Sequence, residues 1–382
     1  MKKRVAIAMS GGVDSSVAAA LLLRQGYDVF GIFAKTWTPQ PGDGTTCTTV
    51  ADRRDALRVA AQLGIPLFTV DLEQDYRDQV VEPLFAGYAA GETPNPDVLC
   101  NRVVKFGGLW RFAQSQGAEF LATGHYARIE DSGNPKSQIP NPKLLRGIDS
   151  NKDQSYFLWD IPREVLPQVL FPIGNYQKDK VRQLAHEFAL PVADKKDSQG
   201  ICFLGQTNLV TFLEQRIKAR PGMIRDWLTG CVLGRHQGIH NYTIGQRHGL
   251  GSLAITPESQ PLYVVALEKK SATVWVGPAA TLDHSQLVVY QLNWLIDLVP
   301  VDLTIFVEIR AQIRYRQPAV RVVFTGPSTL SFDKPVRAAA PGQSIVFYQG
   351  DRLLGGGVIE SVDLGKQSSL DTPVSAIIEF EK

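Results

Sequence analysis

The chain has 382 residues, of which 44% are apolar and 20% charged, and its 40 basic and 38 acidic residues leave a net charge of +2. This composition is that of a soluble globular protein, and the length predicts two or three domains. The charge balance neither demands nor excludes a nucleic-acid partner, because basic residues can cluster locally.

No apolar run reaches the roughly 18 residues of a membrane span, and the N-terminal apolar run is too short for a signal peptide. The four cysteines, Cys47, Cys100, Cys202 and Cys231, form no C-x-x-C pair. A zinc site, a disulfide framework and a membrane partner are therefore not expected, and we expect a cytoplasmic protein.

The first 200 residues alternate between strand and helix patterns. The predicted strands are 4–9, 28–34, 65–72 and 119–129, and the predicted helices are 15–26, 51–64, 73–91 and 102–117. Such alternation is typical of an α/β fold with a parallel sheet covered on both faces. These sheets bind ligands at the carboxyl ends of their strands.

The pattern changes along the rest of the chain. A polar segment at about 130–150, rich in Pro, Asn and Gly, predicts a surface loop. Amphipathic helices are predicted at 178–191 and 207–220.

Short strands dominate from residue 260 on, which is typical of a small antiparallel barrel or sandwich. We therefore predict an α/β domain at 1–205, a central linking domain at 206–285 and a β domain at 286–382.

The stretch SGGVDSS, residues 10–16, lies between the first predicted strand and the first predicted helix. Glycines let a backbone approach a ligand, and successive N–H groups at a helix N-terminus form a nest for an anion. An ordinary glycine turn with serine caps is the alternative, but the strand–turn–helix context favours phosphate binding. The chain contains no G-x-x-x-x-G-K-[ST] motif, so a P-loop kinase is not indicated.

The stretch ETPNPDVLCN, residues 92–101, is predicted to be an extended loop, because each proline keeps the residue before it out of the α region. It ends at Cys100, before a helix expected to begin near Arg102, and a helix N-terminus lowers the pKa of a thiol. Asp97 lies three residues before Cys100, within reach for acid–base chemistry if the loop folds back. From spacing alone, a catalytic thiol and a buried structural cysteine both stay open.

The stretch KKDSQGICFLG, residues 195–205, places Cys202 in a short apolar segment. Lys195 and Lys196 could favour its thiolate. By itself, a cysteine in such a segment is more often a core residue.

The three stretches together are more specific than each alone. SGGVDSS resembles the PP-loop of ATP pyrophosphatases, and N-P-D-x-x-C-N followed by D-S-x-G-I-C-F resembles the tRNA-specific 2-thiouridylase family. Further matching segments are GHYARI (124–129), KDQSYFL (152–158), TIGQRHGLG (243–251) and RYRQ (314–317). The resemblance covers almost the whole chain. It implies an adenine nucleotide alpha hydrolase-like PP-loop domain, a small central domain and a C-terminal antiparallel β-barrel that contacts tRNA.

The resemblance implies a role for each matching residue. Cys202 would carry sulfur as a persulfide, Cys100 would be the nucleophile and Asp97 an acid or base. The residues implied to bind ATP are Ala8, Met9, Ser10, Gly11, Gly12, Val13, Asp14, Ser15, Ser16, Ala34 and Gly124. Those implied to contact the target base or the tRNA are Asn95, Pro96, Asp97, Lys152, Asp153, Gln154, Arg314 and Tyr315. Mg²⁺ would enter with ATP near Asp14, without a metal cage made by the protein.

The implied reaction is 2-thiolation of the wobble uridine, in the Lys, Glu and Gln isoacceptors of tRNA. Oxide is a very poor leaving group, so the uracil 2-oxygen would first be adenylated, and a persulfide on Cys202 would then deliver sulfur. Attack by Cys100 on that persulfide would leave a disulfide for a reductant to reset, and release of sulfide is the open alternative. A cysteine desulfurase or a sulfur-carrier protein would supply the sulfur. The base must leave its stack to react.

Several residues need a separate interpretation. Where the family often has a methionine beside the adenine this chain has Ala34, and Phe33 or Trp37 could take its place. Cys47 is interpreted as an incidental thiol and Cys231 as a structural residue.

Three arginines, Arg310, Arg314 and Arg316, fall on one face of a predicted strand at period two. A solvated strand face would explain them, but with the RYRQ match a phosphate-contacting patch is favoured.

Two other classes of function are alternatives to sulfur transfer. Another PP-loop enzyme, such as an amidotransferase-type synthetase or a ligase acting on a small molecule, would need no pair of separated cysteines. A non-catalytic RNA-binding protein would need no intact SGGVDSS.

Overall fold

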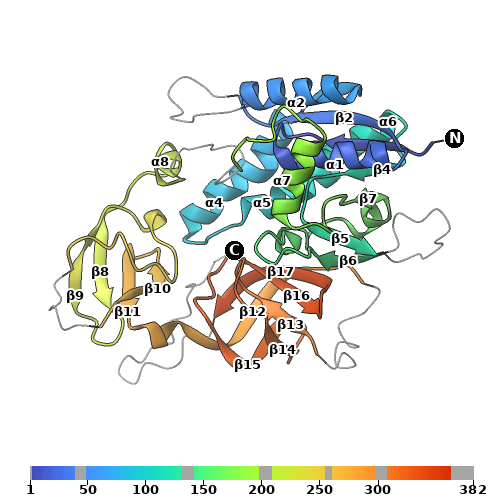
Figure 1. Ribbon diagram of the computed structural model, residues 1–382. Coiled ribbons are helices and arrows are strands. Elements are labelled where there is room, and N and C mark those ends of the chain that lie inside the picture. Colours follow the sequence, from blue (N-terminus) through green and yellow to red (C-terminus); the bar gives the residue numbers. More distant parts are fainter. Residues whose placement is uncertain are drawn as a thin grey trace.

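The structure is a computed structural model that describes residues 2–38, 49–130, 142–197, 209–253, 260–296 and 308–362. Cys47 and Cys202 lie outside the described residues. Three sheets, of five, four and eight strands, organise the described chain (Figure 1). Within these ranges no helix is long and apolar enough to cross a membrane.

The first sheet is parallel throughout, as predicted, and has the order β3-β2-β1-β4-β7. Its strands are β1 (Arg4–Ala8), β2 (Asp28–Lys35), β3 (Leu67–Asp71), β4 (Phe120–Ala122) and β7 (Val169–Leu170). The strand order reverses beside β1, between β2 on one side and β4 on the other. Ligands of open α/β sheets bind at such a switch point, outside the carboxyl ends of the strands.

Side chains of this sheet alternate between two hydrophobic cores, as the period of a strand requires. Val5 and Ile7 of β1 belong to one core, and Ala6 belongs to the other. The helices that pack on the first of these cores are α1 (Val13–Arg24), α2 (Thr49–Leu63) and α7 (Lys178–Glu187).

The opposite face of the sheet is covered by two nearly continuous helical runs. The first consists of α3 (Glu73–Tyr76), the π-helical residues Arg77–Val81 and α4 (Glu82–Ala90), which confirms the helix predicted at 73–91. The second consists of α5 (Pro96–Cys100), the π-helical residues Asn101–Leu109 and α6 (Trp110–Ser115).

The second run begins earlier than predicted, at Pro96 rather than near Arg102. Asn95 caps it, because its Oδ1 accepts a hydrogen bond from the Asp97 N–H at 3.2 Å, and proline suits the first helical position. The prediction of an extended loop therefore holds for residues 92–95 and was wrong from Pro96 on. Cys100 is the fifth residue of a helix and does not precede a helix N-terminus.

The strand predicted at 119–129 is also divided. Only β4 joins the parallel sheet, and β5 (Ala127–Glu130) pairs antiparallel with β6 (Lys143–Arg146). The chain turns between them at Gly124, where a Cβ atom would lie 2.6 Å from the backbone nitrogen of Ser15. This close approach to α1 ends the strand.

The central part of the chain forms the second sheet, with the order β10-β11-β8-β9. The predicted hairpin is confirmed as β10 (Tyr263–Glu268) and β11 (Thr273–Gly277). The strands β8 (Gly222–Asp226) and β9 (Val232–His236) were not predicted, and the helix predicted at 207–220 is described only as α8 (Leu209–Glu214).

The last part of the chain closes into an antiparallel barrel, as predicted, because β12 pairs with both β15 and β17. Its strands are β12 (Asp283–Trp294), β13 (Arg310–Gln312), β14 (Val320–Phe324), β15 (Thr329–Arg337), β16 (Ser344–Gln349) and β17 (Arg352–Val362). The β5–β6 hairpin extends this sheet, since Arg352 pairs with Leu145, and it lies between the α/β layers and the barrel (Figure 1). Barrel residues such as Val346 share one core with Cys100.

Candidate nucleotide and sulfur-transfer site

The loop between β1 and α1 has the backbone of an anion cradle. Gly11 adopts a φ of +73°, and a Cβ atom there would overlap the carbonyl group of Asp52 in α2. Gly12 is the N-cap of α1 and has no side chain to cap the helix. The first N–H groups of α1 therefore point toward the switch point with no cap from this residue, which suits a phosphate.

The serines of the loop differ in what their hydroxyl groups do. Ser16 is fully buried, and its Oγ donates to the carbonyl of Gly12 at 2.7 Å. The Oγ of Ser15 lies 3.3 Å from the Oγ of Ser10 and accepts from the Ser10 N–H. Of these three, only Ser10 is exposed. Two hydroxyls thus shape the loop, and one faces solvent where a ligand would lie.

Gly124 brings the end of β4 against the same loop, because its backbone packs on that of Asp14 and Ser15. Ala34 lies half-buried near the carboxyl end of β2. Phe33 is buried in the core, and Trp37 packs edge-on against Phe212 with ring centroids 6.1 Å apart. Both aromatic rings that were considered as replacements for the methionine are thus packed within the protein.

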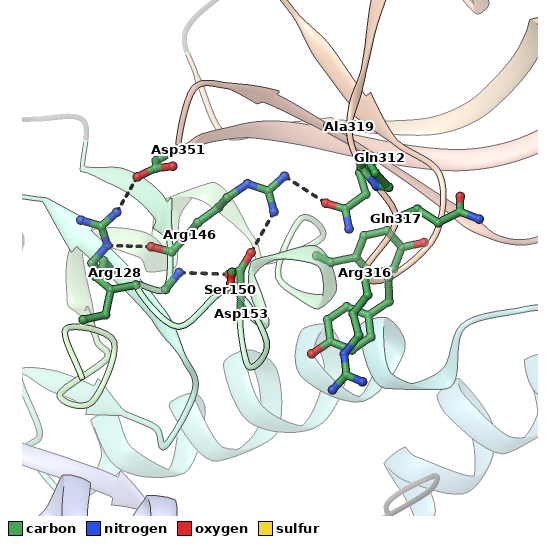
Figure 2. A pocket seen from close by; sticks show the side chains of 14 residues that line it. Arg128, Arg146, Ser150, Asp153, Gln312, Arg316, Gln317, Ala319 and Asp351 are labelled. Carbon is green, nitrogen blue, oxygen red and sulfur yellow. Dashed lines mark hydrogen bonds and ion pairs between the residues drawn. The ribbon is translucent and has the colours of Figure 1, made fainter. Parts of the chain in front are cut away.

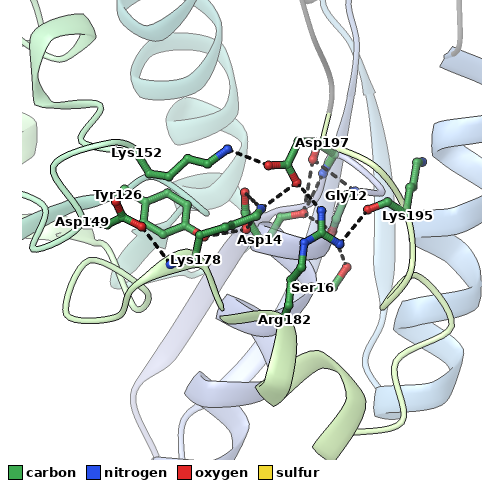
Figure 3. A network of polar contacts seen from close by, with 12 residues as sticks. Gly12, Asp14, Ser16, Tyr126, Asp149, Lys152, Lys178, Arg182, Lys195 and Asp197 are labelled. Carbon is green, nitrogen blue, oxygen red and sulfur yellow. Dashed lines mark hydrogen bonds and ion pairs between the residues drawn. The ribbon is translucent and has the colours of Figure 1, made fainter. Parts of the chain in front are cut away.

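A network of charged side chains surrounds the loop (Figure 3). The Oδ1 atom of Asp14 accepts hydrogen bonds from Lys178 Nζ at 2.8 Å and from the Tyr126 hydroxyl at 2.9 Å. Lys178 Nζ also lies 2.8 Å from Oδ1 of Asp197. One ammonium group therefore joins the PP-loop to the segment that leads toward Cys202.

Asp197 receives two further cations, Lys152 at 2.7 Å and Arg182 at 2.8 Å. Burial alone would raise the pKa of Asp197, but the hydrogen bonds from Lys152 and Lys178 outweigh it and lower the pKa to about 2. Asp197 is therefore ionised at neutral pH. Cys202 follows five residues later in the sequence, outside the described residues.

Lys195 forms a second tie to the loop. Its Nζ donates to Asp52 at 2.7 Å, to Asp55 at 2.8 Å and to the carbonyl of Gly11 at 3.0 Å. Burial alone would lower the pKa of Lys195, but the hydrogen bonds to the two carboxylates outweigh it and raise the pKa. The described contacts of Lys195 are thus with the PP-loop and α2. Its suggested effect on the Cys202 thiolate stays a prediction.

The helix that carries Cys100 also carries Asp97 one turn earlier, on the same face. Cys100 is buried, with 6% of its surface exposed. Burial raises the pKa of Asp97, and the nearby Lys105 ammonium opposes that shift. A carboxylate with a raised pKa is a stronger base than an ordinary aspartate, which suits it to accept a proton from a substrate.

Lys105 connects this helix to the end of β4. Its Nζ lies 3.2 Å from Nε2 of His125, and the Nδ1 atom of His125 lies 2.7 Å from Oγ1 of Thr123. Burial lowers the pKa of His125 well below its ordinary value, so the ring is neutral. An ammonium group only donates, so Nε2 must accept and Nδ1 must carry the proton.

A cavity of about 660 Å³ lies between the β5–β6 hairpin and the barrel (Figure 2). Arg146 crosses it, donating to Asp153 at 2.8 Å and to Gln312 at 3.0 Å. Tyr315 and the exposed Arg316 line its other side. Basic and aromatic groups in one concave surface are suited to a polyanion whose bases can stack.

Family models match three successive parts of the chain. Residues 3–206 match a tRNA methyl transferase HUP domain, 210–278 a tRNA methyl transferase PRC-barrel domain and 284–359 an aminomethyltransferase beta-barrel domain. The tRNA-specific 2-thiouridylase MnmA of Bacillus subtilis is 46% identical over 370 residues, which cover 94% of this chain and 95% of that protein. The chain belongs to the tRNA-specific 2-thiouridylase family.

Other 2-thiouridylases match to a similar extent. The protein from Geobacillus thermodenitrificans is 44% identical over 366 residues, covering 94% of this chain and 95% of its own. Among solved structures, a 4-thiouridine synthetase–RNA complex with bound ATP is 19% identical and covers 56% of this chain and 50% of that chain. The TM-score of that match is 0.33.

The 2-thiouridylase motif KDQ spreads its three side chains in three directions. Lys152 reaches Asp197 in the network around the PP-loop. Asp153 is buried and accepts hydrogen bonds from Arg146 and Ser155. Gln154 accepts from the backbone N–H of Tyr126 at 3.0 Å. Each of these side chains thus has a partner within the protein, and their contacts with tRNA stay a prediction.

The RYRQ motif does not form the expected strand face, and that interpretation was wrong. Strand β13 ends at Gln312, and Arg316 has a φ of +67°. Arg314 turns inward and donates to the carbonyl of Ile244 at 2.6 Å, which joins the barrel to the TIGQRHGLG motif. The chain turns away from the sheet here, so period two no longer applies.

Three of the residues around the PP-loop were missed by reasoning from the sequence: Tyr126, Lys178 and Arg182. Tyr126 lies in a matching motif, and the other two lie on a correctly predicted helix. Only the fold brings them to Asp14 and Asp197. Among the described residues, no group of three or more His, Cys, Asp or Glu side chains could hold a metal ion.

Proposed function

We propose that the protein uses ATP to 2-thiolate the wobble uridine of tRNA. The proposal is carried by the convergence of separate segments on one strand edge. Lys105 and His125 connect the Cys100 helix to the end of β4, and Lys178 connects Asp14 to Asp197, before Cys202. Sulfur transfer to an adenylated base needs a nucleotide site and two thiols close together, and membership of the 2-thiouridylase family supports this assignment.

In the first step the target base meets ATP at the switch point. Gly11, Gly12 and the N-terminus of α1 hold phosphate, and Ser10 adds a hydroxyl donor. Ala8, Met9, Ala34 and Gly124 lie on the same edge and complete the proposed nucleotide site. Mg²⁺ would be bound mainly through the nucleotide, with Asp14 as its nearest carboxylate, and would offset phosphate charge.

Asp97 would take the N3 proton of the uracil as a carboxylate, because burial raises its pKa and so makes it a stronger base than an ordinary aspartate. The 2-oxygen then attacks the α-phosphorus and pyrophosphate leaves. This step replaces an oxide leaving group by AMP. Asn95 and Pro96 begin the same helix and would contact the base that Asp97 deprotonates.

In the second step Cys202 delivers sulfur from a persulfide supplied by a cysteine desulfurase or a sulfur carrier. Cys100 attacks the sulfur bonded to Cys202, and the sulfur released goes to C2 of the uracil as AMP leaves. The resulting Cys100–Cys202 disulfide is opened by a reductant. We expect this chemistry in the cytoplasm, on tRNAs for Lys, Glu and Gln.

We propose that tRNA lies along the cavity between hairpin and barrel, with Tyr315 and Arg316 facing it. Arg314 and the residues Lys152–Gln154 hold this surface in place through their internal contacts. For the domains we propose the division 1–205, 206–285 and 286–382.

The test is thiolation of unmodified tRNA by the wild type, by Cys100→Ser and by Cys202→Ser. The interpretation of Cys231 as a structural residue was wrong, because its side chain is exposed. Cys231→Ser is therefore a matched control and should retain full activity. Loss of 2-thiouridine in both variants, with ATP cleaved to AMP and pyrophosphate by the wild type, is the expected result. Full activity in either Cys100→Ser or Cys202→Ser would contradict the two-cysteine mechanism.

A further inference from the structure

We propose that Lys178 binds the terminal phosphates of ATP and stabilises pyrophosphate as it leaves, an inference that rests on the proposed function. The PP-loop SGGVDSS contains no lysine. A P-loop carries its own lysine for the β- and γ-phosphates, because a leaving phosphate accumulates negative charge. Lys178, at the start of α7, supplies that charge from a distant part of the chain.

The geometry places the ammonium group at the mouth of the loop. Lys178 Nζ lies 2.8 Å and 3.0 Å from the two carboxylate oxygens of Asp14, the second residue of α1. Only 9% of the Lys178 residue is exposed. A phosphate held by the first turn of α1 would therefore lie next to this cation.

The backbone around Lys178 is fixed as well. It is the first residue of α7, and its N–H donates to Oδ2 of Asp149 at 2.9 Å. The helices α1 and α7 pack against each other. Their N-terminal ends meet where Lys178 contacts Asp14, so both helix dipoles favour an anion at this point.

A phosphate could replace Asp197 as the partner of Lys178, because Asp197 has other cationic partners. Besides Lys178 it is bonded to Lys152 and Arg182. If pyrophosphate took the hydrogen bond from Lys178, Asp197 would keep two cationic partners. The exchange therefore does not leave a buried charge unpaired, which is the costly event in such networks.

The chemical step balances without any further reactant. The uracil 2-oxygen forms a bond to the α-phosphorus as the N3 proton passes to Asp97. The bond from the α-phosphorus to the bridging oxygen breaks, and its electron pair stays on pyrophosphate. Lys178 donates an N–H to the charge that develops there and transfers no proton.

The experiment compares Lys178→Met with Lys180→Gln, which removes an exposed cation from the same helical turn. Calorimetry measures binding of inorganic pyrophosphate and of AMP, and rapid quench measures pyrophosphate release in a single turnover with tRNA. Lys178→Met should weaken pyrophosphate binding at least tenfold, leave AMP binding unchanged, and slow release by about 10²–10³-fold. Lys180→Gln should match the wild type. Unchanged pyrophosphate binding in Lys178→Met would overturn the proposal.

Asp197→Asn distinguishes phosphate binding from a purely structural bridge. If Lys178 only joins Asp14 to Asp197, this variant should weaken pyrophosphate binding as much as Lys178→Met does, and that result would refute the inference. We expect Asp197→Asn to bind pyrophosphate at least as tightly as the wild type does, because the side chain that competes with pyrophosphate for Lys178 has lost its charge. Lys178→Gln keeps a donor for Asp14, so it repeats the test if Lys178→Met does not fold.

The proposed function can fail separately from this inference. Release of ADP by the wild type, or no nucleotide cleavage with tRNA, would remove the adenylation step whatever Lys178 does. Pyrophosphate binding by the variants would still report on Lys178 itself.

Discussion

Two clusters of charged residues, each with an aspartate from a motif of the 2-thiouridylase family, differ in what their charges face. Around the PP-loop, Asp14, Lys178 and Asp197 pair with one another at the carboxyl edge of the parallel sheet (Figure 3). We propose that a phosphate ligand takes the place of one of these partners. At the junction with the barrel, Asp153 is buried and held by Arg146 (Figure 2).

The difference shows that a residue of a matching motif can have a structural partner inside the protein, as Asp153 has in Arg146. Arg146 packs over the Tyr348 ring, with its guanidinium carbon 3.5 Å from the ring centroid, while it pairs with Asp153. The Tyr156 hydroxyl donates to the carbonyl of Ser344 at 2.8 Å. These contacts join the α/β part to the barrel, and every charge in them is already satisfied.

The largest expected effect is a difference in the free energy of unfolding between variants of the two clusters. Asp153→Ala leaves Arg146 without its buried partner and should lower the free energy of unfolding by about 3–5 kcal/mol. Asp14→Asn keeps a polar group at a half-exposed site and should lower it much less, while abolishing ATP cleavage. Chemical denaturation of both variants checks this, and equal destabilisation would remove the distinction.

The next effect concerns the close approach of β4 to α1. In Gly124→Ala the new methyl carbon would lie 2.6 Å from the backbone nitrogen of Ser15, so the loop must move. Because a shift of about 1 Å at a reacting group can cost 10²-fold, kcat/KM for ATP should fall by about that factor. Gly326→Ala is the control for a lost glycine, because a Cβ atom there would make only ordinary contacts of 3.6 Å or more. Steady-state kinetics of both variants test this prediction, and an unchanged kcat/KM in Gly124→Ala would contradict it.

A smaller effect should appear in the pH profile of pyrophosphate release. Asp97 must be ionised to accept a proton, so the rate falls as the pH drops through its pKa. Lys105 lowers that pKa, so Lys105→Met should raise it and move the fall in rate to higher pH. Arg111→Gln removes an exposed cation farther along the same helical run and should leave the profile in place. An unmoved profile in Lys105→Met would refute the role of Asp97 as the base.

The smallest expected effect lies at the surface of the barrel. Arg316 is exposed, and its guanidinium group lies 5.1 Å from the centroid of the Tyr315 ring. Arg316→Gln should weaken tRNA binding and reduce the slope of log K against log salt concentration by about 1, with no change in thermal stability. Arg310→Gln, which removes an arginine paired with Glu308 on the same barrel, serves as the comparison. Equal slopes for the wild type and Arg316→Gln would place the tRNA elsewhere.

Local patterns determined much of this protein. The alternation of apolar runs and helix signals predicted the parallel sheet. The glycines of SGGVDSS predicted a tight turn, and Gly11 adopts there a positive φ that favours glycine. The hairpin of β10 and β11 and the strands of the barrel also follow from short-range patterns. Each of these features depends on residues that are neighbours in the chain.

Where the sequence misled, longer-range packing decided. Asn95 and Pro96 start a helix that reads locally as a proline-rich loop, and Gly124 ends a strand because α1 lies against it. Arg314 turns to Ile244 rather than to solvent. For Gly124 and Arg314 a partner distant in the chain outweighs the local preference for a strand. For Asn95 and Pro96 a helix cap outweighs the local preference for a turn.

The sequence by itself predicted a phosphate cradle near the start of the chain and a role for Cys100 and Cys202 in its chemistry. Only the tertiary structure decided which cations face that cradle. Lys178 is 164 positions from Asp14 in the sequence, and no local pattern records such a pairing. It arises because α1 and α7 pack on the same face of one parallel sheet, which brings their N-terminal ends together.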